Sequence, residues 1–137
     1  DLHLSIRRQR QMCIRDRKNL MLFCADAVDI LNKQIANESL DVINIFFPDP
    51  WPKKRHRKRR LISEDFISLI ESKLKQNGLV HICTDWADYA HDIHSLFKSI
   101  EGFKPLEKLP RRLQTKFEKK GLALGHSIYE FAFQLLR

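Results

Sequence analysis

Glycine is scarce in this chain, and nothing in it resembles a glycine-rich loop. The 137 residues contain four glycines, Gly78, Gly102, Gly121 and Gly125, and their spacing does not match the loops that cradle a phosphate or a nucleotide cofactor. Cysteine is also rare. The chain has three cysteines, an odd number, and they share no metal-ligand spacing. They are typical of reduced thiols and predict a cytoplasmic protein without a disulfide framework.

Long apolar runs are missing as well. No run approaches the roughly 18 residues that a membrane-spanning helix needs. The charged start of the chain is not followed by the apolar segment of a signal peptide. The hydrophobic share of 43% is ordinary for a globular core. Together these features predict one domain or a piece of one, with no membrane-spanning segment.

Positive charge is abundant but concentrated in one place. The formal net charge is +8, and seven of the 25 basic residues lie within residues 53–60, so the others nearly balance the 17 acidic residues. One dense patch predicts a polyanionic partner, either a nucleic acid or an acidic membrane. Runs of this kind are also common as solvated faces or nuclear-import signals.

Strand-like and helix-like segments alternate from residue 19 onward. Apolar and β-branched runs predict strands at residues 20–24, 41–47, 79–84, 103–109 and 128–136. Apolar spacing and capping residues predict helices at residues 26–33, 63–78 and 85–102. The first two strands look buried, and residues 41–47 look covered on both sides. The alternation predicts an α/β fold, a sheet with helices on both faces.

The first 17 residues do not fit this alternation. They are rich in arginine and show neither helix caps nor a clear period. We interpret residues 1–17 as non-native or disordered, which leaves residues 18–137 as the folded part.

Three aspartates follow predicted strands. Asp26, Asp49 and Asp85 each come directly after an apolar run or its proline-framed end. Because parallel sheets bind ligands beyond the carboxyl ends of their strands, we expect all three at one edge. Helix capping is the competing role, more usual for Asp85 and equally plausible for Asp26.

Asp49 has a distinctive setting. Pro48 and Pro50 flank it, and proline restricts both its own backbone and that of the residue before it. The sequence therefore predicts a rigid tip that aims a carboxylate, with Trp51 beside it to pack or stack. The alternative is a structural turn with no chemistry.

Two other groups complete the candidates. His91 and His94 are spaced to share a helix face, but no further ligands accompany them, so we predict no metal site. Thr115, Lys116, Phe117 and Glu118 lie late in the chain on a segment without clear periodicity. Charged and aromatic residues on such a connection suggest a binding loop.

Several motifs together resemble a known family. They are Phe-Phe-Pro-Asp-Pro-Trp at residues 46–51 followed by a basic run, Thr-Asp-Trp at 84–86, Thr-Lys-Phe-Glu at 115–118 and Gly-His at 125–126. In this order and spacing they resemble the bacterial-type tRNA (guanine-N7)-methyltransferases over about residues 18–137. The resemblance implies a class I, Rossmann-like methyltransferase fold, S-adenosyl-L-methionine as cofactor, and methylation of guanine N7 in the variable loop of tRNA.

The resemblance also implies roles for individual residues. Asp49 would be catalytic and would touch the cofactor, and Asp26 would bind the cofactor. The residues implied to contact the substrate guanosine are Lys53, Asp85, Thr115, Lys116, Phe117 and Glu118. The implied phosphate patch for tRNA consists of Lys54, Arg55, Arg57, Lys58, Arg59 and Arg60. Neither a membrane nor a metal is implied, and the oligomeric state stays open.

The chain departs from the family at its start. The first strand of the family, its glycine-rich turn and the next acidic strand end do not appear in it. We therefore expect residues 18–137 to be the C-terminal two-thirds of a single methyltransferase domain that lacks the first strands. A chain of this kind should bind no cofactor measurably and should expose residues 41–47 as an apolar edge.

Two other functions fit some of the motifs. Another class I methyltransferase, acting on a base amine, would carry an Asp-Pro-Pro-aromatic element similar to residues 49–52. A non-catalytic RNA-binding module could use the basic run alone, but this would leave the three strand-end aspartates without a purpose.

Overall fold

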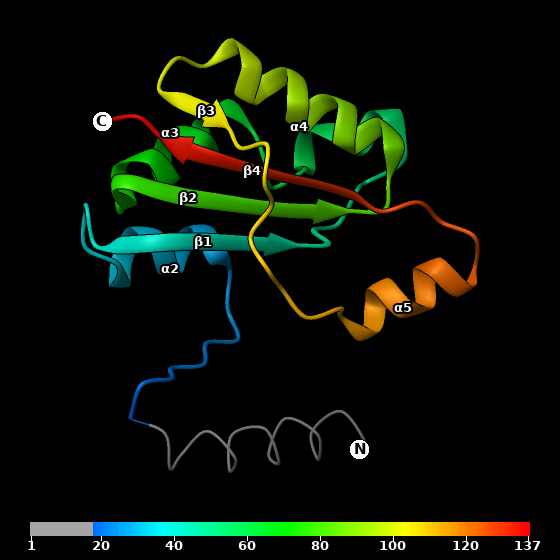
Figure 1. Cartoon of the computed structure of the whole chain (residues 1–137), viewed down its shortest axis with the longest axis horizontal. Coiled ribbons are helices and arrows are strands. Elements are labelled where there is room, and N and C mark those ends of the chain that lie inside the picture. The colour runs from blue at the N-terminus through cyan, green and yellow to red at the C-terminus, as the bar shows by residue number, and fades with distance from the viewer. Residues whose placement is uncertain (1–17) are drawn as a thin grey trace.

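A single mixed sheet organises the protein. The computed structural model describes residues 18–137, so the prediction for residues 1–17 lies outside the described part. The elements are α2 (Ala27–Gln34), β1 (Leu40–Phe46), η1 (Lys54–Arg59), α3 (Glu64–Lys73), β2 (Leu74–Thr84), α4 (Ala87–Ser99), β3 (Phe103–Pro105), α5 (Lys116–Ala123) and β4 (Tyr129–Leu135). The strand order is β1-β2-β4-β3, with β1 parallel to β2 and β4 antiparallel to both of its neighbours (Figure 1). The predicted α/β class is confirmed.

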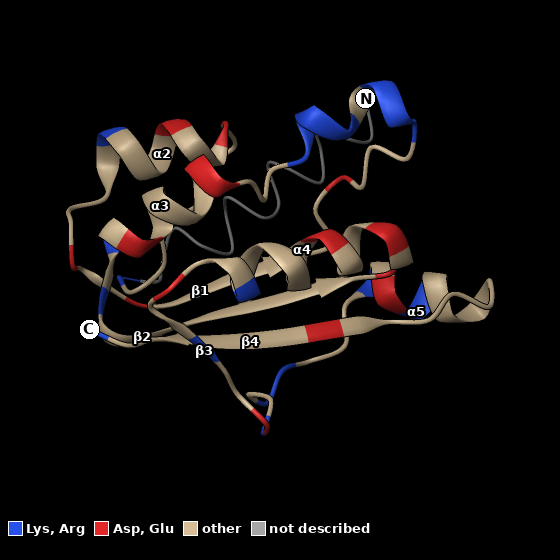
Figure 2. Cartoon of the chain, turned by 90° about the horizontal axis from the view of Figure 1, so that it is seen from above, with Lys and Arg blue, Asp and Glu red and all other residues tan. Residues whose placement is uncertain are grey.

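Helices cover one face of this sheet. Figure 2 shows α2, α3 and α4 on one side, while the segment between β3 and α5 crosses the other side. The side chains agree, because Val80 and Ile82 of β2 belong to the apolar core, whereas His81 lies on the opposite face and contacts Glu130. The prediction of helices on both faces is wrong for the described residues, since a loop takes their place on the second face.

The core lies between the sheet and helices α3 and α4. Ile67 and Ile70 of α3 are fully buried at a spacing of three, and Tyr89 and Ile93 of α4 at a spacing of four, so each helix presents one apolar face. Burial of a large apolar side chain stabilises the fold by about 1.5–3 kcal/mol. These contacts fix α4, and with it the start of that helix next to Asp85.

Local capping explains where two helices begin. The Asp26 carboxylate accepts hydrogen bonds from the amides of Val28 (2.8 Å) and Asp29 (3.2 Å), and Ser63 Oγ accepts one from Phe66 (3.2 Å), so both predicted caps are confirmed.

The predicted cap at Asp85 is wrong. The N-cap position of α4 is Trp86, which makes no side-chain capping bond, and Asp85 bonds elsewhere.

Helix α3 ends earlier than the sequence suggests. The prediction extended it to residue 78, but it ends at Lys73. Leu74 takes an extended conformation and pairs with Leu40 of β1, so pairing with a distant strand ends the helix before its local stop signal at Asn77 and Gly78. Strand β3 is also shorter than predicted, with three residues in place of residues 103–109.

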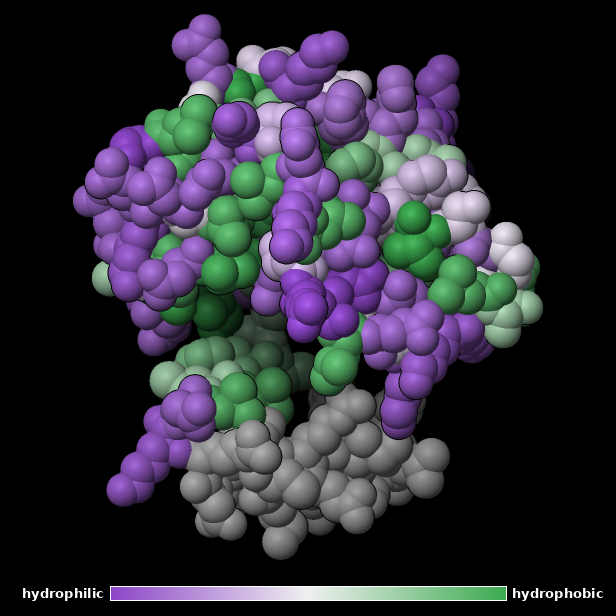
Figure 3. Space-filling view, viewed as in Figure 1, coloured by the Kyte–Doolittle hydropathy of each residue, from purple (hydrophilic) through white to green (hydrophobic). Residues whose placement is uncertain are grey.

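Two predicted buried segments are exposed. Residues 20–24 form no strand, and Met21 is 77% exposed (Figure 3, apolar side chains beside the grey residues). Strand β1 was predicted to be covered on both faces, yet Ile45 is its one buried residue and Val42 is 45% exposed. Both of these predictions are wrong, whereas the prediction that residues 41–47 form an exposed apolar edge is confirmed. Strand β1 lies at the sheet edge, and within the described residues no strand pairs with its outer side. No helix in the described part combines the length and apolarity needed to cross a bilayer.

The burial pattern predicts a contrast between two strand residues. Ile82→Ala should lower the free energy of unfolding by about 2–5 kcal/mol, because it opens a cavity in the packed core. Val42→Ala on the edge strand should cost less than about 1 kcal/mol, since it removes little buried area. Urea denaturation of both variants measures the difference. Equal losses would contradict the assignment of β1 to an open edge.

Candidate active site

Parallel pairing brings two strand-end aspartates to one edge of the sheet. Phe46 of β1 is in register with Cys83 of β2, and the pairing continues through a hydrogen bond from Phe47 N to Cys83 O of 2.8 Å. Asp49 follows Phe46 by three residues and Asp85 follows Cys83 by two, so both lie beyond the carboxyl ends of adjacent strands. This is where open parallel sheets bind their ligands.

The Asp49 tip has a strained backbone. Phe47 and Trp51 both have positive φ angles, 53° and 42°, which are rare for bulky side chains. The Asp49 carboxylate is exposed and accepts a hydrogen bond from the Trp51 amide (3.0 Å), which closes a short turn around it. Strain of this kind persists only where the surroundings enforce it, and it gathers at functional sites.

Asp85 bonds across the chain to His126. The distance between Asp85 Oδ2 and His126 Nδ1 is 2.9 Å, and the Asp85 side chain is 14% exposed against 46% for His126. Gly121 of α5 lies against the same carboxylate, since a Cβ built there would stand 3.5 Å from Asp85 Oδ2. Asp85 therefore links the end of β2 to α5. The sequence motif contained His126 but gave no hint of this partner.

The Thr-Lys-Phe-Glu segment starts α5 at this edge. Thr115 Oγ1 caps the helix by accepting from the Glu118 amide at 3.0 Å. The ring of Phe117, 55% exposed, lies 5.1 Å from the ring of Phe47 at the end of β1. Lys116 is exposed. The structure thus brings Phe117 next to the end of β1, with Thr115 at the start of the same helix, and it buries Glu118.

A partly buried arginine, Arg112, accounts for the position of Glu118. Arg112 donates to both carboxylate oxygens of Glu118 (2.5 and 3.0 Å) and to both oxygens of Glu130 on β4 (3.0 and 3.1 Å). Its guanidinium also lies 5.6 Å from the centre of the Phe46 ring. These are bidentate charge-assisted bonds, the strong kind. Sequence reasoning missed Arg112, because no local pattern marks a residue whose partners are on another strand and helix.

The ion pairs shift the pKa values of both glutamates downward. The Arg112 hydrogen bonds hold the pKa of Glu118 below its usual range. For Glu130, burial acts to raise the pKa, but hydrogen bonds from Arg112 and His81 outweigh it and lower the pKa. Both carboxylates are therefore ionised at neutral pH, and the network is at full strength there.

His81, Cys83 and Glu130 form the one group of potential metal ligands found among the described residues, with ligand atoms within 4.8 Å of one another. Glu130 is already engaged by Arg112 and by His81, whose Nε2 lies 2.6 Å away. Burial raises the pKa of the Cys83 thiol to about 11, which disfavours the thiolate that binds metal. We assign this group a structural role.

The basic run folds as a single short helix that follows the Asp49 tip. Five of its residues are exposed and form no ion pair with the described residues: Lys53, Lys54, Arg55, Lys58 and Arg59. Arg59 also lies over the Trp51 ring at 5.2 Å. Arg57 and Arg60 differ, because both pair with carboxylates of α4. The run therefore carries less free positive charge than its composition suggests.

Asp26 is positioned by a different element. It caps α2, whose amino end lies toward the carboxyl end of β1 behind the sheet (Figure 1). Its hydrogen bonds go to its own helix, so the structure does not join Asp26 to Asp49 by direct contact.

Comparison with known proteins agrees with this geometry. A protein family described as "Putative methyltransferase" matches residues 4–131. The chain belongs to this methyltransferase family. The mixed sheet is consistent with the class I methyltransferase fold that the family resemblance implied.

Individual relatives carry a more specific name. Proteins from Escherichia coli O6:K15:H31 and Salmonella choleraesuis, each named tRNA (guanine-N(7)-)-methyltransferase, are 42% identical over 87% and 88% of this chain. A protein of the same name from Nitrosococcus oceani is 42% identical over 85% of the chain. These matches cover 53%, 53% and 51% of the relatives, so the chain spans about half the length of the curated relatives it matches.

Acid should loosen the Arg112 network. The pKa values of Glu118 and Glu130 are depressed in the folded state, so their contribution to stability is complete above the unfolded value of about 4.3 and is lost as pH falls through the folded values. We expect the melting temperature to drop below about pH 4.3 more steeply in the parent than in Arg112→Met. Melting curves from pH 6 to pH 3 measure this, and equal acid slopes would contradict it.

Proposed function

We propose that this chain carries the guanosine- and tRNA-binding part of a tRNA (guanine-N7)-methyltransferase, which transfers a methyl group from S-adenosyl-L-methionine to N7 of a guanine in the variable loop of tRNA. The observation that carries the proposal is the exposed Asp49 tip at the carboxyl edge of the sheet, followed directly by an exposed basic helix. A base and its phosphates can be held by these two features side by side.

The chemistry requires little from the protein beyond placement. Guanine N7 has a lone pair and no proton, so no general base is needed. Alignment alone can supply roughly 7–11 kcal/mol of the barrier. Methylation leaves positive charge on the purine, and the exposed Asp49 carboxylate stabilises that charge as it develops.

The residues at this end of the sheet fit the cofactor in part. S-adenosyl-L-methionine would supply the methyl group as a sulfonium. The exposed carboxylates of Asp26 and Asp49 can accept hydrogen bonds from its polar groups. Within residues 18–137 there is no glycine-rich loop to approach the cofactor closely.

The guanosine would lie between the two strand ends and α5. Phe117 and Trp51 offer aromatic faces for stacking, and Asp85 and Lys53 offer polar contacts. Thr115 and Lys116 complete this set at the start of α5. Glu118 contributes through the backbone that it anchors, because both of its carboxylate oxygens are bonded to Arg112.

Asp49 should matter for chemistry and little for tRNA affinity. We expect Asp49→Ala to reduce methyl transfer by about 100-fold or more, as for loss of one preorganised electrostatic group. Its dissociation constant for tRNA should change less than about twofold, because the phosphate contacts remain. The assay measures labelled methyl incorporation into tRNA, with the product base identified by mass spectrometry, in a longer form of the protein that binds the cofactor.

The product decides between the alternatives. 7-Methylguanine supports the proposal, a methylated exocyclic amine favours a different class I methyltransferase, and tRNA binding without transfer in the longer form favours a plain RNA-binding module.

The exposed basic residues should set the salt dependence of tRNA binding. Replacing Lys54, Arg55 and Lys58 by alanine should flatten the slope of log affinity against log salt by roughly 0.7–0.9 per lost phosphate contact. Lys75→Ala is the control, since Lys75 pairs with Asp41 near the amino ends of β1 and β2, at the end of the sheet away from Asp49. An unchanged slope in the triple variant would show that the phosphates are bound elsewhere.

A further inference from the structure

Arg60 stands apart from the basic run that it ends. Its neighbours Lys58 and Arg59 are exposed, whereas Arg60 is 6% exposed. A buried charge must be paired and hydrogen-bonded, because leaving water is otherwise too costly. The partners of the Arg60 guanidinium therefore reveal what holds it inside.

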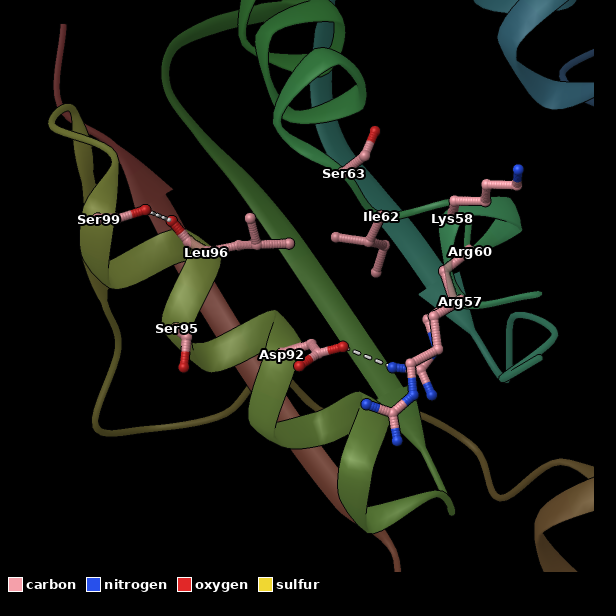
Figure 4. A pocket seen from close by; sticks show the side chains of 9 residues that line it. All are labelled: Arg57, Lys58, Arg60, Ile62, Ser63, Asp92, Ser95, Leu96 and Ser99. Atoms are coloured by element: carbon pink, nitrogen blue, oxygen red, sulfur yellow. Dashed lines mark hydrogen bonds and ion pairs between the residues drawn. The ribbon is translucent and has the colours of Figure 1, made fainter. Parts of the chain in front are cut away.

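The Arg60 guanidinium donates hydrogen bonds along its edges and lies against an aromatic ring with one face. Nε donates to the Pro50 carbonyl oxygen (2.6 Å), and the two terminal nitrogens donate to Asp92 (2.5 Å) and Asp88 (2.9 Å) of α4. The Arg60 guanidinium carbon lies 4.8 Å from the centre of the Tyr89 ring. Figure 4 shows Arg60 directed at Asp92, with the bond between them dashed. The Tyr89 hydroxyl in turn accepts from the Ile62 amide at 3.0 Å.

These contacts join two parts of the proposed site. Pro50 directly follows Asp49 in the strained tip, while Asp88, Tyr89 and Asp92 lie in the first turns of α4, just beyond Asp85. One rigid, planar group thus ties the Asp49 tip to the helix that follows the second strand-end aspartate.

We propose that Arg60 is a positioning residue for the Asp49 tip and does not contact tRNA phosphates. The proposal rests on the proposed function only in taking that tip as the reaction centre. Asp88 and Asp92 neutralise the charges of Arg57 and Arg60, so a phosphate would have to displace carboxylates already in place. Lysine cannot substitute, because one ammonium group lacks the planar fork that reaches three acceptors at once.

Arg60→Lys tests the inference while keeping the charge. The first readout is the backbone order parameter of the Trp51 amide from ¹⁵N relaxation of the folded chain. We expect a rigid value near 0.85 in the parent and a flexible value below about 0.6 in the variant. The Ile82 amide in the sheet should stay rigid in both. The second readout is methyl transfer by a longer form that binds the cofactor, for which we expect kcat to fall about 10- to 100-fold with KM for tRNA within about twofold.

Arg137→Lys is the matched control. Arg137 also donates to a backbone carbonyl, that of Glu71 (2.6 Å), and pairs with Glu38, but it lies at the far end of the sheet. It should leave both the Trp51 order parameter and kcat unchanged. If Arg60→Lys behaves like this control, Arg60 does not position the tip.

A second variant tests the same inference if Arg60→Lys does not fold. Asp92→Asn weakens one partner of Arg60 and leaves the arginine in place. The positioning role predicts a lower Trp51 order parameter and an unchanged salt slope for tRNA binding. A phosphate role predicts the reverse, because a freed arginine would steepen the slope by roughly 0.7–0.9, and that result would overturn the proposal.

The readouts also separate this proposal from the proposed function. The order parameter needs no activity, so a loosened tip supports positioning whether or not methyl transfer is detected. Absence of transfer in a longer form that binds the cofactor would count against the methyltransferase assignment alone.

Discussion

The parallel pairing of β1 with β2 is the constraint on which the rest of the site depends. It places Phe46 beside Cys83 and so puts the two strand-end aspartates, Asp49 and Asp85, at one edge. A shift of one residue would turn every side chain of β1 to the other face. The register is held by apolar contacts of Ile45 and Ile82 with the helices packed behind them. The contacts that pack the core therefore also fix the geometry of the site.

The two faces of the sheet are stabilised by different physics. Helices α3 and α4 bury apolar side chains on one face, where the gain is non-directional and scales with area. On the other face, the loop before α5 is held by the Arg112 ion pairs with Glu118 and Glu130. Such bonds are directional, so they set the position of α5 closely, and they depend on the charges of both glutamates. The segment that brings α5 to the site is thus held by charge.

Charge is also divided within the basic run. Residues that look equivalent in sequence fall into a paired set and a set without ion pairs among residues 18–137, because α4 presents Asp88 and Asp92 to Arg57 and Arg60. The hydrogen bond from Arg60 holds the pKa of Asp88 below its usual range, which keeps that carboxylate ionised. One short segment can in this way present positive charge to a ligand and brace the neighbouring tip.

The sequence by itself determined the features that depend on neighbouring residues. Caps at Asp26 and Ser63, the proline-framed tip at Asp49 and strands β1 and β4 all follow from preferences that act within a few residues. Only the tertiary structure decided the partners of Asp85, Arg60 and Arg112, the early end of α3 at Lys73 and the exposure of residues 20–24. Each of these depends on what lies opposite a residue after the chain has folded, and a strand or a buried charge exists only where a distant segment completes it.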